Sequence, residues 1–490
     1  MIIILSLAVI FSGFFELFLR LKSIWPKRKI YGWIIFLIVL MLNGWLLIGY
    51  GNRLWVISIS IVSLYRLFNV YRITESRIQS EYLRSIVKST SIRLMVFQLV
   101  VMISGILFSI ILKNNQDQWD ILGATNFLLS FGLFITIRRQ LKISQRIALS
   151  TILIDKKAPT LTVAIPARNE SDSLNNCLIS LLSCDYPKLE IMVLDDQSTT
   201  QRTSEVIRSF AHQGVVFIAG APVKKGWLAK NWAYEQLLEA ANGDIILFCG
   251  ADTRFTKESL KFLVSSLVSR HKSVISILPK NDVPQRMYSR FFQPLRYAWE
   301  VALPRRKLQR PPVLSTCWLA KRSYLVSKGG FKAVTNRVVP ESYFAKLSTE
   351  EDGYSFSAYD GVLSNKPLAD LVETALRIRY PQLRRRPELV ALITMIEFWF
   401  MLSMLALFIY GIIIFQPFLF ILSLISIIIY SYVFGTIAKI TYRQKVLFSY
   451  VFWPFYLVLD IYLMHLSMFK YEFGEVLWKG RSVVSTVMDN

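Results

Sequence analysis

The stretch Leu161-Thr-Val-Ala-Ile165-Pro-Ala-Arg-Asn-Glu170 decides the fold class of this chain. Its first half is an apolar run of the kind found in β-strands, and its second half is a polar cluster. The same succession recurs downstream, with apolar runs at residues 189–194, 215–218 and 245–248. The polar clusters that follow them are Asp195-Asp196-Gln-Ser198, Lys224-Lys225-Gly226-Trp227 and Gly250-Ala-Asp252-Thr253. Because helix-length segments separate the runs, the pattern predicts an α/β domain with a mainly parallel, Rossmann-like sheet and with function at the carboxyl ends of its strands.

The polar clusters carry the kinds of side chain that a nucleoside diphosphate needs. Asp196 can accept a hydrogen bond from a ring N–H or a sugar hydroxyl, and Asp252 suits a hard divalent cation that carries a diphosphate. Lys230 adds positive charge for phosphate oxygens. Solvated polar side chains end the strands of any α/β domain, but four such clusters in this order favour a nucleotide-diphosphate site.

Residues 161 to about 386 resemble the GT-A domain of family-two inverting glycosyltransferases. The motifs that carry the resemblance are Pro166-Ala-Arg168-Asn169-Glu170 for P-x-R-N-E, Asp195-Asp196-Gln-Ser198 for D-D-x-S, Gly226-Trp-Leu-Ala-Lys230-Asn-Trp232 for G-W-x-G-K-x-W, Gly250-Ala-Asp252 for D-x-D, and Gly329-Gly330-Phe331. Trp478-Lys-Gly-Arg481 resembles the W-K-G-R of a membrane-bound branch that glycosylates carotenoids. The resemblance implies donor contacts for Pro166, Arg168, Asn169, Glu170, Asp195, Asp196, Lys230, Asp252, Arg379 and Arg385. It also implies that Asp196 reads a uracil ring.

Two departures from the family pattern fall at the metal and at the base. Gly250 replaces the first carboxylate of D-x-D, so Asp252 is the one metal ligand expected from this motif. Counting back from Gly353-Tyr354 places the family's E-D pair at Glu341-Ser342, which makes Glu341 the expected base and Asp352 the reserve. We therefore expect Mn2+ or Mg2+ to bind weakly, with help from the oxygens of the donor diphosphate.

The departures leave alternatives to catalysis open. One is a catalytically degenerate relative that binds a nucleotide or scaffolds a membrane complex. A second, weaker alternative is a polysaccharide synthase. It is weaker because Gln382-Leu-Arg-Arg385 resembles the processive Q-x-x-R-W motif but is not followed by its Trp. The arginines of this region are Arg377, Arg379, Arg384 and Arg385. They suit either a diphosphate clamp or juxtamembrane positive charge.

The remainder of the chain is apolar enough to enter a membrane. The whole chain has 490 residues, of which 53% are hydrophobic, and its net charge is +24. The Lys and Arg residues that give this charge flank the apolar runs. Such flanks indicate positive-inside topology and attraction to anionic lipid rather than to nucleic acid. We predict a membrane region over residues 1–150 with about five hydrophobic segments, a cytoplasmic GT-A domain over 151–388, a second membrane region over 389–470 with two to three segments, and a tail over 471–490.

Some segments near the membrane depart from a simple span. Residues 54–67 form a short apolar segment, and residues 66–93 are basic and mixed, which predicts a cytoplasmic amphipathic helix. Residues 284–303 are rich in Arg and aromatic side chains and predict a helix in the membrane interface. Residues 447–468 carry Pro454, Asp460 and His465 and are expected to be re-entrant or interfacial. The four cysteines lack the spacing of a zinc site or a disulfide framework and are expected to be free thiols.

The favoured hypothesis is an integral-membrane glycosyltransferase that moves a sugar, with inversion, from a nucleoside-diphosphate sugar to a lipid or lipid-linked acceptor. A UDP-sugar is the expected donor, the plasma membrane of a prokaryote is the expected location, and no nucleic acid is expected as a partner. An inverting transfer needs a base for the acceptor hydroxyl and positive charge for the leaving diphosphate.

Overall fold

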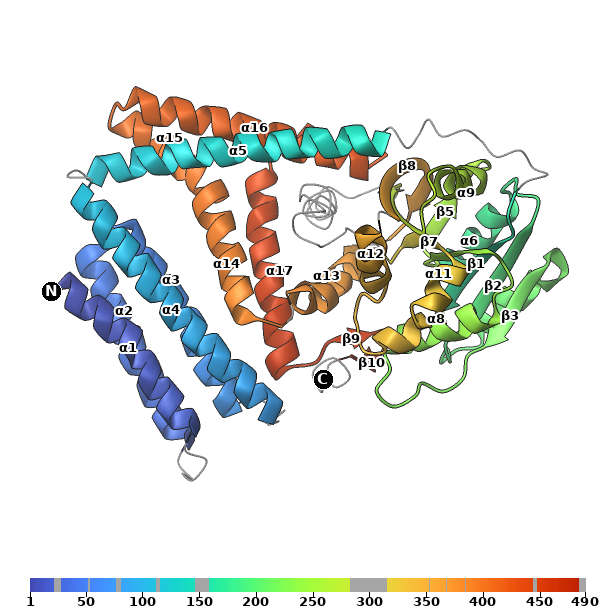
Figure 1. Cartoon of the computed structure of the whole chain (residues 1–490), viewed down its shortest axis with the longest axis horizontal. Helices are drawn as coiled ribbons and strands as arrows, with labels where there is room; N and C mark the ends of the chain where they lie inside the picture. Colours follow the sequence, from blue (N-terminus) through green and yellow to red (C-terminus); the bar gives the residue numbers. More distant parts are fainter. Residues whose placement is uncertain are drawn as a thin grey trace.

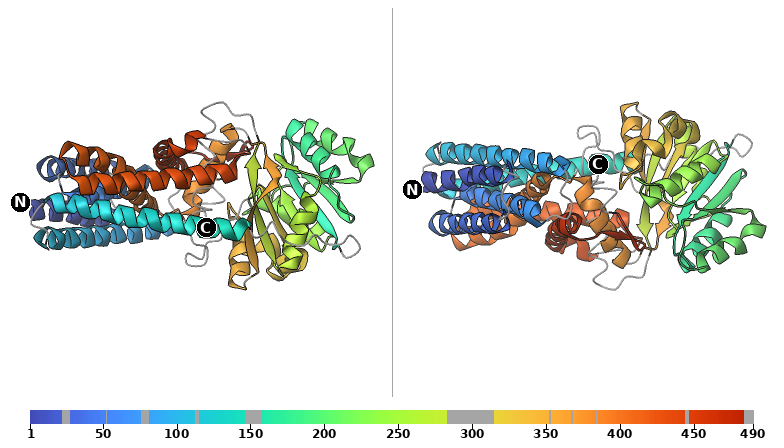
Figure 2. Two further views of the ribbon diagram at one scale, coloured as in Figure 1. Left: turned by 90° about the horizontal axis from the view of Figure 1, so that it is seen from above. Right: turned by 90° about the horizontal axis from the view of Figure 1, so that it is seen from below.

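The computed structural model describes residues 1–21, 28–51, 53–75, 81–111, 115–145, 158–282, 315–351, 353–366, 368–383, 385–443 and 447–483. A bundle of helices forms one end of the molecule and an α/β domain forms the other (Figures 1 and 2). The predicted interfacial helix at 284–303, the reserve base Asp352 and Arg384 lie outside the described residues.

The α/β domain contains one sheet with the order β3-β2-β1-β4-β7-β6-β8-β5. Its strands are β1 (Leu161–Ala167), β2 (Leu189–Asp195), β3 (Val215–Ala219), β4 (Ile245–Cys249), β5 (Thr253–Phe255), β6 (Val274–Asn281), β7 (Cys317–Lys321) and β8 (Tyr354–Ser364). The predicted apolar runs are confirmed as β1 to β4, and these strands pair in parallel. β6 and β8 are also parallel, whereas β7 runs antiparallel to β4 and β6 and β5 runs antiparallel to β8.

Helices cover both faces of this sheet. They are α6 (Asp172–Leu182), α7 (Arg202–Ser209), η3 (Ala211–Gln213), α8 (Ala229–Ala240), α9 (Ser259–Ser269), α11 (Arg322–Ser327), η5 (Gly330–Val334) and α12 (Glu341–Glu350). Successive side chains of a strand point to opposite faces, so Val163 packs in the core with α6 and α9 while Ala164 packs in the core with α8. Because buried apolar side chains cover both faces of the sheet, the polar residues of a functional site must lie at the strand ends.

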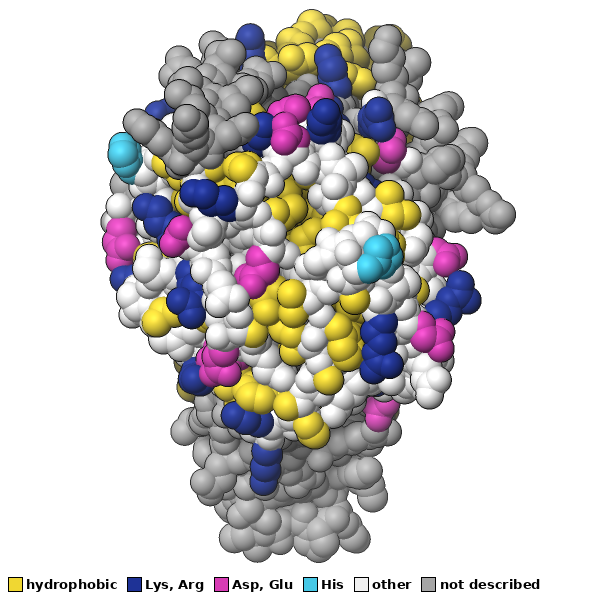
Figure 3. Space-filling model, turned by 90° about the vertical axis from the view of Figure 1, so that its right-hand side faces the viewer, with side chains coloured by type: hydrophobic (Ala, Val, Ile, Leu, Met, Phe, Trp, Pro, Cys, Tyr) yellow, Lys and Arg dark blue, Asp and Glu magenta, His cyan; other side chains and the backbone are white. Residues whose placement is uncertain are grey.

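The surface of the domain that faces away from the bundle is polar and mixed in charge. In Figure 3 basic and acidic side chains are interspersed there with small apolar areas. This face has the character of a surface in water.

The helical end of the molecule is built from two runs of helices. The first comprises α1 (Ile2–Leu21), α2 (Arg28–Tyr50), α3 (Leu54–Glu75), α4 (Glu81–Ile111) and α5 (Asn115–Gln145). The second comprises α13 (Leu368–Gln382), α14 (Pro387–Glu397), η6 (Phe398–Leu402), α15 (Ser403–Ile413), α16 (Pro417–Thr441), η7 (Leu447–Tyr450) and α17 (Trp453–Phe473). Among the described residues, two stretches are long and apolar enough to cross a membrane, Trp119–Arg139 in α5 and Pro417–Thr441 in α16.

The prediction of a separate amphipathic helix over residues 66–93 is wrong. The helix α3 continues through Arg66 to Glu75, and α4 begins at Glu81. Arg66 is fully buried, and its Nη1 donates to the carbonyl oxygens of Val9 and Ile10 at 3.0 Å and to Oε1 of Gln98 at 2.7 Å. A charge with this many partners can stay inside a helical bundle, so Arg66 does not end the helix.

The last predicted segment begins later than expected. Residues 447–450 form the short helix η7, and α17 starts at Trp453 with Pro454 in its first turn, where a proline is tolerated. In Figure 1, α17 runs across the direction of α5 and α16. After α17 the chain forms a two-stranded hairpin of β9 (Leu477–Trp478) and β10 (Arg481–Ser482). Lys479 and Gly480 form its turn with φ of 48° and 80°, as a tight hairpin turn requires.

Candidate active site

The ends of β1 and β2 are tied together by the P-x-R-N-E and D-D-x-S residues. Arg168 is buried, and its Nη1 donates to the carbonyl oxygens of Asp196, at 2.8 Å, and of Gln197. Asp195 accepts hydrogen bonds from the backbone N–H and the hydroxyl of Ser198. Asp195 therefore shapes the turn, and its neighbour Asp196 is the carboxylate left for other partners.

The rest of this motif also shapes the strand ends. Pro166 lies in β1 opposite Leu194 of β2. Asn169 has a positive φ of 52°, and its Oδ1 accepts from the backbone N–H and the hydroxyl of Thr199. Asparagine tolerates this left-handed conformation better than most residues do, which explains its use at this sharp turn.

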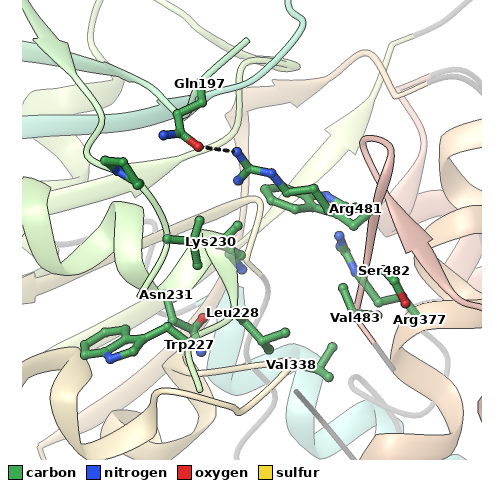
Figure 4. Close-up of a pocket in the computed structure, with 14 residues that line it drawn as sticks. Gln197, Trp227, Leu228, Lys230, Asn231, Val338, Arg377, Arg481, Ser482 and Val483 are labelled. Carbon is green, nitrogen blue, oxygen red and sulfur yellow. Dashed lines mark hydrogen bonds between the residues drawn. The ribbon is translucent and has the colours of Figure 1, made fainter. Parts of the chain in front are cut away.

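The C-terminal hairpin, residues 476–483, contacts this edge of the sheet. Arg481 Nη1 lies 2.9 Å from both carboxylate oxygens of Asp196, and its Nη2 donates to Oε1 of Gln197 at 2.9 Å (Figure 4). Lys479 Nζ lies 3.0 Å from Oε1 of Glu170, and the Lys479 carbonyl accepts from Nε of Arg168 at 3.2 Å. The hairpin thus gives a cationic partner to each of these two carboxylates.

Burial is the largest influence on the pKa values of Glu170, Asp196 and Arg168 at this edge of the sheet. It raises the pKa of Glu170 and the pKa of Asp196 above their ordinary values, while Lys479 and Arg481 act in the opposite direction. Burial and the nearby charge of Arg481 both lower the pKa of Arg168. Without the hairpin cations the two carboxylates would be harder to keep charged.

A cavity of about 450 Å3 lies between the α/β domain and the hairpin. Its walls are formed by Gln197, Pro222, Val223, Trp227, Leu228, Ala229, Lys230, Asn231, Val338, Arg377, Trp478, Arg481, Ser482 and Val483. Figure 4 shows Lys230, Arg377 and Arg481 around this space. The first turn of α8 also lies in its wall, so backbone N–H groups and the positive end of the helix dipole add to the three cations. The cationic lining of the cavity suits an anionic ligand.

The G-W-x-G-K-x-W motif builds one wall of this cavity. Asn231 Nδ2 donates to the carbonyl oxygens of Val334, Thr335 and Arg337 at 2.8–2.9 Å, which fixes the loop before α12. Trp232 Nε1 donates to Ala221 at 3.1 Å. These contacts hold the start of α8 rigidly and leave Lys230 to face the cavity.

The predicted base lies directly behind Lys230. Glu341 is fully buried at the start of α12, and its Oε2 lies 3.6 Å from Nζ of Lys230. The hydroxyl of Ser315 donates to its other oxygen. Within the described part of the chain, Oε2 accepts no hydrogen bond. If Glu341 is the base, Oε2 is the oxygen that would take the proton of an acceptor hydroxyl.

Asp252 follows β4 on the same edge of the sheet. It is half-buried, and its Oδ2 accepts from the hydroxyl of Ser364 at 3.2 Å. A Cβ added at Gly250 would lie 2.5 Å from Oδ1 of Asp252, so a side chain at position 250 needs the space that Asp252 uses. The described residues contain no group of three Asp, Glu, His or Cys side chains that could hold a metal. A cation held by Asp252 would have to take its remaining ligands from a bound diphosphate.

The structure separates the predicted arginines. Arg377 lines the cavity, with its guanidinium 5.5 Å from the centre of the Trp478 ring. Arg379 pairs instead with Asp460 of α17, at 2.5 Å between Nη2 and Oδ1. The backbone of Arg385 bonds with Tyr380, and Arg385 is not in the cavity wall. Arg481 is a cavity residue that was not among the site residues predicted from the sequence, although it is the last residue of the W-K-G-R motif.

The fold and the site together define a GT-A protein: a Rossmann-like sheet whose strand ends carry carboxylates and cations beside a cavity lined by cations. Residues 162–327 match the family described as Glycosyl transferase family 2. This part of the chain is therefore a family 2 glycosyltransferase domain.

Similar proteins agree with this assignment over part of their length. The probable glycosyltransferase YdaM of Bacillus subtilis (strain 168) is 30% identical over 122 residues, which are 24% of this chain and 29% of that protein. A 4,4'-diaponeurosporenoate glycosyltransferase of Staphylococcus aureus (strain bovine RF122 / ET3-1) is 30% identical over 134 residues, which are 27% of this chain and 34% of that protein. The chain thus spans about a third or less of the length of these curated relatives.

Among solved structures, a mannosyltransferase from Pyrobaculum calidifontis in complex with GDP-Man and Mn2+ is similar over 72% of this chain and 98% of that chain. Its sequence identity is 18% and the TM-score is 0.42.

Proposed function

We propose that this chain is an integral-membrane glycosyltransferase that moves a sugar from a nucleoside-diphosphate sugar to a lipid or lipid-linked acceptor, with inversion. The observation that carries the proposal is the cavity beside Asp196, because Lys230, Arg377 and Arg481 surround it and the buried Glu341 lies behind it. In this assignment Asp196 contacts the nucleobase, the cations contact the diphosphate, and Glu341 accepts the proton of the acceptor hydroxyl. A Mg2+ or Mn2+ ion held by Asp252 would add positive charge at the leaving diphosphate.

The surface of the helical bundle supports a place in a membrane. Large apolar side chains are strongly exposed on α2, where Met41 is 74% exposed and Ile48 89%. Polar side chains such as Asn43 and Gln98 are buried between the helices instead. A water-soluble protein rarely exposes apolar patches of this extent, whereas a lipid-facing surface requires them.

The helix α17 supports an acceptor that approaches from the lipid. Phe455, Val458, Tyr462 and Phe469 are 45–59% exposed and lie along one side of the helix, while its other side packs against α13. An exposed apolar stripe on a helix that crosses the direction of the long apolar helices fits the membrane interface. One relative is named for 4,4'-diaponeurosporenoate, a carotenoid, which agrees with an apolar acceptor.

The nucleotide assignment predicts a specific loss of binding. Replacing Asp196 by Ala should weaken the binding of UDP by about 1–3 kcal/mol, because a buried hydrogen bond to the base is lost. Isothermal titration of the full-length protein in detergent or nanodiscs measures this change. Asp185→Ala is the matched control, since Asp185 pairs with Lys261 at the other end of the sheet. Unchanged affinity in a folded Asp196→Ala protein would show that the base lies elsewhere.

The basic loops predict that the α/β domain lies in the cytoplasm. A cysteine introduced at Gln213, which is exposed on the domain, should react with a membrane-impermeant maleimide only after cells are opened. A cysteine introduced at Phe415, in the turn before α16, should react in intact cells. The wild-type protein gives the background from Cys184, which is partly exposed. Labelling of Gln213→Cys in intact cells would place the domain outside.

A further inference from the structure

We propose that the C-terminal hairpin forms a wall of the donor site and that Arg481 is a donor-binding residue. When the nucleotide enters, the guanidinium of Arg481 leaves the carboxylate of Asp196 and binds the donor diphosphate instead. The proposal rests on the function proposed above and adds to it a residue and a movement. The hairpin lies far along the chain from the strands that it meets, since Arg481 and Asp196 are 285 positions apart.

The first step of the argument is that Arg481 occupies the carboxylate that the nucleobase needs. Its Nη1 lies 2.9 Å from both oxygens of Asp196, and that side chain is only 4% exposed. A ring N–H that approaches Asp196 meets this guanidinium. Base and arginine therefore compete for one acceptor.

The second step is that Arg481 has another anion within reach once a donor is bound. Its side chain lines the same cavity as Lys230 and Arg377, and it comes from the wall opposite Lys230 (Figure 4). A guanidinium binds two phosphate oxygens as well as it binds a carboxylate, because its N–H groups form a planar fork. When the guanidinium moves to the diphosphate, the ring N–H of the base takes its place as the hydrogen-bond donor to Asp196.

The third step is that the hairpin is held from its base while its tip contacts the site. Val476 and Val483 are buried at the base, and the N–H of Val483 donates to the carbonyl of Val476 at 3.0 Å. At the tip, contact with the domain is made by side chains of Lys479 and Arg481 and by one carbonyl. These contacts are polar, so a bound diphosphate can replace them without opening a hydrophobic core.

The test compares the binding of a nucleoside with that of its diphosphate to the full-length protein. Uridine and UDP are titrated into the wild type and into Arg481→Gln, with guanosine and GDP as a second pair. We expect the ratio of the uridine Kd to the UDP Kd to fall at least about tenfold in Arg481→Gln, because one charged contact to the diphosphate is lost while competition at Asp196 is relieved. Arg481→Lys keeps the charge and should restore part of the ratio.

Arg208→Gln is the matched control, because Arg208 is exposed at the far end of α7 and should leave the ratio unchanged. An equal ratio in the wild type and in folded Arg481→Gln overturns the role of Arg481 and leaves the proposed function standing. If the wild type binds neither diphosphate, the proposed function itself fails, and the inference fails with it.

Discussion

Replacing Glu341 by Gln should lower the turnover of a nucleotide sugar by about 10²–10⁴-fold while donor binding stays intact, which is the size of loss expected when a general base is removed. The amide has nearly the same shape as the carboxylate but cannot take the proton of an acceptor hydroxyl. Ser315 and the start of α12 keep their places around it. Turnover in purified membranes and calorimetry with UDP on the same preparation measure the two quantities.

Glu351→Gln is the control for this experiment, because Glu351 follows the last residue of the same helix, is exposed, and pairs with Lys328 on the surface. Full turnover in Glu341→Gln would move the base to Asp352 or favour a nucleotide-binding scaffold without catalysis. A loss of UDP binding together with turnover would instead assign Glu341 to holding Lys230 in place.

The second large effect is expected at Asp252. Asp252→Ala should lower turnover by about 10²–10³-fold, since a charge-stabilising group at the leaving diphosphate is removed. In the wild type, Mn2+ should bind appreciably only when UDP is present, because a single carboxylate attracts a hard cation weakly. Titration of Mn2+ with and without UDP measures this dependence. Asp360→Ala is the control, because Asp360 is exposed and pairs with Lys280.

Gly250→Asp is the converse variant. It should tighten Mn2+ binding, provided that Asp252 rotates away from the added Cβ, which would lie 2.5 Å from its Oδ1. Tight Mn2+ binding without nucleotide in the wild type, or full turnover in excess chelator, would contradict a role for Asp252 as a metal ligand. The negative charge on the leaving diphosphate would then be stabilised by Lys230, Arg377 and Arg481.

The strands β1 to β4 could be predicted because each is a short apolar run that stops at a polar cluster, and that local signal needs no knowledge of distant contacts. The pairing of Arg481 with Asp196 could not, because it joins residues 285 positions apart and nothing local to either residue specifies the other. The wrong prediction for residues 66–93 has a related cause. A basic residue beside an apolar run marks the end of a span only if it has no partner inside the bundle, and Arg66 has a buried partner in Gln98.

The predicted roles of the arginines show the same limit. Arg377 and Arg379 are two positions apart, so they point in different directions from α13, one to the cavity and the other to Asp460 of α17. The sequence alone allowed both arginines to be phosphate ligands, and it placed Asp460 in a segment expected to be re-entrant or interfacial. Only the packing of α13 on α17 distinguishes these possibilities.

The contact between Arg481 and Asp196 has a consequence for biosynthesis. Ribosomes add about 5–20 residues per second, so the 285 positions between the two residues correspond to roughly 15–60 s of translation. During that interval β2, which precedes Asp196, has already been made, whereas α14, α15, α16 and α17 have not all been synthesised. A nascent chain therefore exposes the strand ends around Asp196 without the hairpin, which can pair with them only after the later helices have been synthesised.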